Sequence, residues 1–128
     1  MASLTPPPPR VLGPLTRTDF VRYQGASGDM NPVHHDEPFA RASGYPAPLA
    51  VGMFPAGVMA SHAADWLGPE KVRRTRIRWM KPAFPGTVLT LTAEILSHEA
   101  GAVELELTAT DEAGDAALKV WMSFVGVE

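Results

Sequence analysis

Hydrophobic and polar residues alternate with a period of two along the second half of the chain. This alternation predicts β-strands, because successive side chains of a strand point to opposite faces of a sheet. The segments that show it cover residues 76–80, 88–93, 103–108 and 117–125. Turn residues, glycine above all, separate these segments at short intervals. We therefore expect an antiparallel sheet made of consecutive strands.

One long, mainly apolar segment precedes these strands, and it predicts a helix over residues 52–67. Pro55 suits a first helical turn, and Gly68 followed by Pro69 is typical of a helix end. Small or apolar residues occupy nearly every face, which favours a buried helix over an amphipathic one. A buried helix beside a strand meander predicts the α+β class: an antiparallel sheet wrapped around a central helix.

The first third of the chain lacks long periodic segments. Residues 1–14 form a proline-rich lead-in that we expect to be extended and poorly ordered. A short helix should follow, with Thr18 as its N-cap. Residues 25–48 then predict a long ordered loop, with a helical turn near 37–43. Ordered loops of this length tend to be functional.

Composition narrows the class of protein. A chain of 128 residues with 45% hydrophobic and 20% charged residues is typical of one globular domain, here residues 1–128. The net charge of −3 gives no support for broad binding to nucleic acids or anionic membranes. The absence of cysteine excludes disulfides, thiolate metal sites and cysteine nucleophiles.

The sequence also gives an expectation for localisation and assembly. The N-terminus lacks the charged and apolar regions of a signal peptide, and prolines and glycines interrupt the longest uncharged stretch, residues 44–64, so we expect a cytoplasmic protein. One helix packed on a small sheet leaves the apolar surface of three large side chains to be buried, those of Trp79, Trp121 and Phe124. We expect a dimer or higher oligomer to cover them, the alternative being a monomer core that holds all three.

Candidate chemistry lies in the segment SGDMNPVHHD, residues 27–36. Asp29 and His34 can reach one molecule if the chain folds back between them, and Asn31 followed by Pro32 favours such a turn. A carboxylate and an imidazole form a general acid–base pair suited to neutral pH. The alternative is a solvated turn without catalytic function.

A metal site is the third reading of this segment, because six side chains in it could ligate a metal. They are Asp29, Asn31, His34, His35, Asp36 and Glu37. The EF-hand pattern fails, however, since its positions 6 and 12 fall on His34 and Ala40. We expect no metal.

Three parts of the sequence together resemble the MaoC-like (R)-specific enoyl-CoA hydratases. They are YQGASGDMNPVH at residues 23–34 with Ala40, PLAVGM at residues 48–53 and WMKPAFPG at residues 79–86. The resemblance runs from about Leu15 to the end of the chain. It implies a single hotdog domain whose residues 27–48 form the overhang that lies across the sheet in hydratases.

The resemblance also implies roles for single residues. Asp29 and His34 match the pair that holds the water, and Asn31 matches the asparagine that orders the loop. Gly52 matches the glycine whose backbone N–H receives the thioester oxygen, a task that suits a helix N-terminus. Its neighbours Val51 and Met53 are candidate substrate contacts.

The reaction implied is reversible syn hydration of a trans-2-enoyl-CoA, or dehydration of an (R)-3-hydroxyacyl thioester. No cofactor is implied, since coenzyme A enters only as part of the substrate. A homodimer or dimer of dimers is expected, with a heteromer as a further possibility. The rival functions are a subunit that depends on a catalytic partner and, less favoured because residues 53–64 contain no acid, an acyl-CoA thioesterase.

Two positions depart from the family pattern, and one cluster stays ambiguous. Val51 stands where many members have histidine, and Ala60 where some have serine, with Ser61 one residue later. These departures bear on the substrate class. Five cations also gather near the third motif: Arg73, Arg74, Arg76, Arg78 and Lys81. We favour a solvated face for them over contacts with the phosphates of coenzyme A.

Overall fold

The computed structural model describes residues 3–128 and contains one five-stranded antiparallel sheet. The strands are β1 (Arg10–Leu12), β2 (Val72–Trp79), β3 (Leu89–Glu99), β4 (Ala102–Thr110) and β5 (Ala116–Phe124). Their order across the sheet is β1-β3-β4-β5-β2. Strands β3, β4 and β5 are joined by short turns, whereas β2 reaches the sheet before them in sequence and lies on its far edge.

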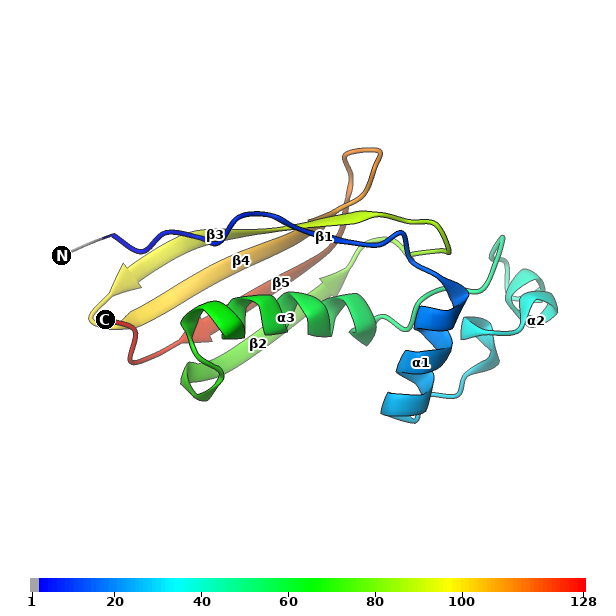
Figure 1. Cartoon of the computed structure of the whole chain (residues 1–128), viewed down its shortest axis with the longest axis horizontal. Coiled ribbons are helices and arrows are strands. Elements are labelled where there is room, and N and C mark those ends of the chain that lie inside the picture. The colour runs from blue at the N-terminus through cyan, green and yellow to red at the C-terminus, as the bar shows by residue number, and fades with distance from the viewer. Residues whose placement is uncertain (1–2) are drawn as a thin grey trace.

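The helices divide into two groups. They are α1 (Arg17–Ser27), α2 (Glu37–Ala42) and α3 (Met53–Leu67), with 3-10 turns η1 (Pro32–His34) and η2 (Pro69–Lys71). Helix α3 runs along one face of the sheet, while α1 and α2 gather beyond its N-terminal end (Figure 1). The expected α+β arrangement of a sheet with a central helix is confirmed.

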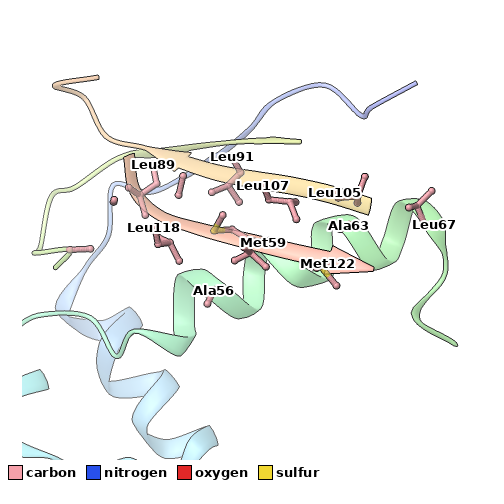
Figure 2. Close-up of a cluster of buried hydrophobic side chains, with 14 of the residues drawn as sticks. Ala56, Met59, Ala63, Leu67, Leu89, Leu91, Leu105, Leu107, Leu118 and Met122 are labelled. Atoms are coloured by element: carbon pink, nitrogen blue, oxygen red, sulfur yellow. The ribbon is translucent and has the colours of Figure 1, made fainter. Parts of the chain in front are cut away.

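The core lies between α3 and the sheet. Ala56, Met59 and Ala63 of α3 face Leu118 and Met122 of β5 (Figure 2), and all five are nearly inaccessible to solvent. Inward side chains of β3 and β4 complete the layer, including Leu89, Leu91, Leu105 and Leu107. Burying one such large side chain stabilises the fold by about 1.5–3 kcal/mol.

Two local elements differ from the sequence prediction. Helix α1 begins at Arg17 with Thr16 as its N-cap, not Thr18, because Thr16 and Asp19 form a reciprocal capping box. Strand β1 lies inside the proline-rich lead-in and pairs with β3 from Arg10 to Leu12. Pro6 to Pro9 precede the strand and Pro14 follows it, and an edge strand tolerates prolines outside its paired residues.

The three large aromatic residues have different environments. Phe124 is buried in the core of the protomer, whereas Trp121 is half-buried on the opposite face of the sheet. Trp79, the last residue of β2, leaves 49% of its surface exposed. The protomer core therefore covers one of the three.

Within residues 3–128, no helix has the length and apolar character needed to cross a membrane.

The turn between β4 and β5 holds the chain that follows β2. The Lys81 ammonium lies 2.6 Å from Asp111 and 3.2 Å from Asp115. Its hydrogen bond to Asp111 is the main cause that lowers the pKa of this carboxyl, aided by the Asp115 N–H. The same contact raises the pKa of Lys81.

Replacing Asp111 by Asn should destabilise the protein in a pH-dependent way. The folded-state pKa of Asp111 lies below its ordinary value of 3.8. The negative charge of Asp111 therefore stabilises the fold above pH 3.8, and this stabilisation is lost as the pH falls further. The free energy of unfolding of Asp111→Asn, measured with urea, should lie below that of the wild type at neutral pH. The difference should shrink below pH 3.8, and a difference that stays constant into strong acid would contradict this account.

Candidate active site

Helix α1 delivers the chain to the site and ends abruptly there. Its C-cap, Gly28, has φ of 80°, a left-handed conformation that glycine adopts without strain. Asp29 follows at once, and its own side chain accepts the Asn31 N–H at 3.3 Å. The acid therefore stands at the start of the overhang, in a turn that its side chain helps to close.

A buried amide holds this overhang in place. Gln24 is 1% exposed, and its Nε2 donates to the carbonyls of Asp29 at 2.9 Å and Asn31 at 3.1 Å. These two bonds fix the orientation of the amide, so its Oε1 accepts from His35 Nδ1 at 3.0 Å. One side chain of α1 thus satisfies three polar groups of the loop.

The sequence prediction did not single out Gln24. The sequence does contain a signal that Gln24 is buried, because Phe20 and Gln24 are four residues apart and share one face of α1. Phe20 is completely buried, so a polar residue one turn later had to find buried partners.

The structure brings Asp29 and His34 together. The distance from Asp29 Oδ2 to His34 Nε2 is 3.8 Å, and the aspartate side chain is 47% exposed against 11% for the histidine. This separation is too long for a direct hydrogen bond and leaves room for one small molecule bonded to both groups.

A backbone carbonyl sets the tautomer of His34. Its Nδ1 lies 2.8 Å from the Leu49 carbonyl oxygen, which can only accept, so Nδ1 carries the hydrogen. In the neutral ring Nε2 is then a free acceptor, and it is the nitrogen that faces Asp29.

Beside His34 opens a pocket of about 300 Å³, at the low end of the range for small-molecule sites. Its walls are mainly apolar and come from the end of the overhang, the start of α3, the end of β2 and the start of β5. The lining residues are His34, Leu49, Ala50, Gly52, Pro55, Trp79, Met80, Lys81, Pro82, Ala83, Ala117 and Leu118.

Gly52 lies at the N-terminus of α3, in the wall of this pocket. Among residues 3–128, its N–H donates to no backbone or side-chain acceptor. Its carbonyl accepts the Trp79 indole N–H at 2.9 Å. A Cβ at this position would stand 2.8 Å from the Trp79 Nε1, so only glycine allows this approach.

The remaining residues of interest lie around the pair. Asn31 Oδ1 accepts the Val33 N–H at 3.0 Å and so caps the η1 turn that carries His34. Val51 is buried and Met53 is 44% exposed, and neither lines the pocket. Ala60 packs against the core. Sequence reasoning gave no role to Trp79, Met80 or Leu49, whose contribution follows from tertiary contacts.

Within the described chain from Ser3 onward, no group of three or more histidine, aspartate or glutamate side chains gathers as metal ligands would. The site presents an acceptor pair beside an apolar pocket.

Replacing Gln24 by Leu should loosen the overhang, because two carbonyls and one imidazole lose their partner. We expect the free energy of unfolding to fall by about 1–3 kcal/mol. Amide hydrogen exchange of residues 29–35 should accelerate more than exchange in β4, whereas equal acceleration in both segments would argue against a local clamp.

Comparisons with known proteins show which protein family this chain is similar to. Residues 5–116 match the family model described as "MaoC like domain". The chain is 36% identical over 90 residues to 3-hydroxyacyl-thioester dehydratase X of Mycobacterium tuberculosis (strain ATCC 25618 / H37Rv), a match covering 69% of this chain and 31% of that protein. The chain spans less than a third of the length of the first curated relatives it matches.

Solved structures show the same fold. The ChsH1-ChsH2 complex from Mycobacterium tuberculosis contains a chain with a TM-score of 0.85 at 20% identity, with 94% of each chain covered. The R-hydratase PhaJ1 from Pseudomonas aeruginosa has a TM-score of 0.81 at 22% identity, covering 94% of this chain and 79% of that one. The chain has the hotdog fold and belongs to the MaoC-like hydratase and dehydratase family.

Proposed function

We propose that the protein hydrates trans-2-enoyl thioesters to (R)-3-hydroxyacyl thioesters and catalyses the reverse dehydration. The observation that carries the proposal is the Asp29–His34 pair, 3.8 Å apart, beside an apolar pocket that His34 and Gly52 both line. Membership of the MaoC-like family supports this reaction class.

The pair suits a water molecule. Neutral His34 offers Nε2 as an acceptor and Asp29 offers a carboxylate oxygen, so one water can donate a hydrogen bond to each. Its oxygen lone pairs then remain free to attack. During hydration the water oxygen bonds to carbon 3 of the enoyl group, one water proton passes to the pair, and a proton from the pair goes to carbon 2.

Gly52 suits the thioester oxygen. Negative charge grows on this oxygen as water adds, and a free N–H at the first turn of α3 stabilises it by hydrogen bonding and by the helix dipole. The Trp79 indole binds the Gly52 carbonyl, in the next peptide unit, and so restrains the Gly52 backbone from its other side. The acyl chain then lies among the apolar residues of the pocket, with the thiol carrier, coenzyme A or an acyl carrier protein, outside it.

A second candidate is a hotdog subunit that acts only beside a partner chain. The exposure of Asp29 and of Trp79 at the pocket favours it, because a water-adding site works best when bulk solvent is excluded. We propose that the chain works in an assembly of hotdog subunits in the cytoplasm, as a dimer or as part of a heteromer.

Turnover should depend on both members of the pair. The turnover rate can be measured from the decrease in enoyl-thioester absorbance with short, medium and branched trans-2-enoyl-CoAs. This rate should be about 10²–10⁴-fold lower in Asp29→Asn and in His34→Ala than in the wild type. Asp65→Asn and His98→Gln change the same residue types away from the site and should retain wild-type rates. Full turnover in the Asp29 and His34 variants would refute the assignment, and no turnover by the wild type alone would favour the partner-dependent subunit.

Gly52→Ala should act through Trp79. The added Cβ meets the indole at 2.8 Å, so we expect a shifted tryptophan emission spectrum and a lower kcat, as Trp79 moves and the Gly52 carbonyl loses its hydrogen bond. Gly57→Ala is the matched control, because it adds the same methyl to the same helix with nothing within 4 Å. Equal spectra and rates for both variants would contradict this role of Gly52.

A further inference from the structure

A hollow of about 330 Å³ lies on the face of the sheet that points away from α3. Ser123 of β5 stands at its centre, opposite Arg74 of β2 on one side and Glu104 of β4 on the other. Ser97 of β3 lies beyond Glu104. The neighbours of these residues along β4 and β5 are buried on the side of α3, so this row faces outward. The volume is at the low end of the range for small-molecule sites.

Side-chain lengths and a bulge produce the hollow. Serine at both 97 and 123 places short side chains between and beside the long side chains of Arg74 and Glu104. Strand β3 also has a bulge next to Ser97, and its extra residue, Leu96, lines the hollow with 51% of its surface exposed. A bulge bends its strand and redirects side chains. The depression therefore follows from the local sequence of three strands.

The polar groups of this hollow have unused hydrogen-bonding capacity. Among residues 3–128, the guanidinium groups of Arg74 and Arg76 and the hydroxyl of Ser97 form no side-chain hydrogen bond or ion pair. Glu104 Oε2 accepts the Ser123 hydroxyl at 2.6 Å, which leaves Oε1 open. Arg74 does not reach Glu104, because the strand between them separates their backbones by about 10 Å.

The next row along the same face differs, because its groups bind one another. Glu106 accepts Lys119 Nζ at 2.7 Å and Trp121 Nε1 at 2.9 Å, and these hydrogen bonds lower the pKa of its carboxyl. They also fix the Trp121 ring, which lines the hollow and carries the Arg76 guanidinium 4.5 Å from its centroid. The hollow thus combines one fixed aromatic wall with open polar groups.

The charges of the hollow favour a ligand with two different ends. Two guanidinium groups against one carboxylate leave it positive, and Arg74 and Arg76 lie only about 7 Å apart along one face of β2. Guanidinium groups suit the oxygens of a phosphate. Glu104 Oε1 can only accept a hydrogen bond, so it disfavours a bare anion and favours a hydroxyl. A phosphate at one end and hydroxyls at the other satisfy both requirements.

We propose that this hollow binds a small phosphate monoester of a sugar or polyol. The phosphate lies between Arg74 and Arg76, and hydroxyls of the organic part bond to Glu104 and Ser97. The carbon skeleton packs against the Trp121 ring, as apolar walls do around the few polar contacts of a small-molecule site.

The proposed site is separate from the pocket beside His34. Within the part of the chain that the structure describes, no residue lines both cavities. Trp79, in the wall of the pocket, follows Arg74 by five residues, about 16 Å along β2. Binding in the hollow is therefore a property beyond the proposed function, and its test needs no enoyl thioester.

Isothermal titration calorimetry of the full chain tests the proposal with glucose 6-phosphate, glycerol 3-phosphate, inorganic phosphate and glucose. At least one of the two esters should bind once per chain, at least about tenfold more tightly than inorganic phosphate or glucose, because only an ester engages both ends. Arg74→Gln should weaken this binding by at least about tenfold. Arg78→Gln removes the same charge from the same strand and face, outside the hollow, and should leave binding unchanged.

Glu104→Ala separates recognition of the whole ester from attraction of its phosphate alone. This variant loses the acceptor for a ligand hydroxyl and also loses a negative charge. It should therefore weaken binding of the ester while strengthening binding of inorganic phosphate. Stronger binding of both ligands would overturn the proposal, because the organic part would then make no specific contact.

Other outcomes would also overturn it. Equal losses in Arg74→Gln and Arg78→Gln, measured at about 150 mM salt to screen distant charges, would indicate diffuse attraction. No saturable binding of either ester would leave the hollow without the proposed ligand. Displacement of the ester by coenzyme A, with a raised KM for enoyl-CoA in Arg74→Gln, would assign the hollow to the thioester carrier instead. All substituted side chains are exposed, so unchanged melting temperatures should confirm that the variants fold.

Discussion

The packing of α3 on the sheet is the contact on which the remaining structure depends. Ala56, Met59 and Ala63 bury one face of the helix against β5 and its neighbours, and this contact holds α3 along the sheet (Figure 2). The first residues of α3 then form one wall of the pocket, and the end of β2 forms another. The overhang lies beyond the end of this packed layer and is held by hydrogen bonds more than by apolar burial (Figure 1).

The sequence could predict the elements whose signal is local. Alternation placed β2 to β5, small apolar residues placed α3, and the turn composition between Gly28 and Pro32 placed the pair together. Strand β1 was not predictable in this way, because its three residues become a strand only by pairing with β3, far along the chain. The same holds for the N-cap of α1, where two threonines two residues apart offer the same local chemistry and only Thr16 has Asp19 at the reciprocal position.

The geometry of the candidate site was predictable to the extent that its residues lie in contiguous motifs. Asp29, His34 and Gly52 were identified from the sequence, and the structure brings the first two within 3.8 Å of one another. Val51 and Met53 were candidate substrate contacts because they are next to Gly52 in sequence, but neither lines the pocket. Neighbouring positions at a helix start point in different directions. Gln24, Leu49 and Trp79 act through contacts over 5 to 27 residues of sequence, which no local pattern encodes.

The bond between His34 and the Leu49 carbonyl has a stereochemical consequence. Leu49 orients the imidazole through its C=O, and Gly52, three residues later, lines the same pocket at the start of α3. Under the proposed function, one short stretch of main chain therefore fixes both the side from which water approaches and the point where the carbonyl oxygen is held. The handedness of the product then depends on these backbone atoms together with the Asp29–His34 pair, and not on the chemical nature of the buried side chains at Ala50 and Val51.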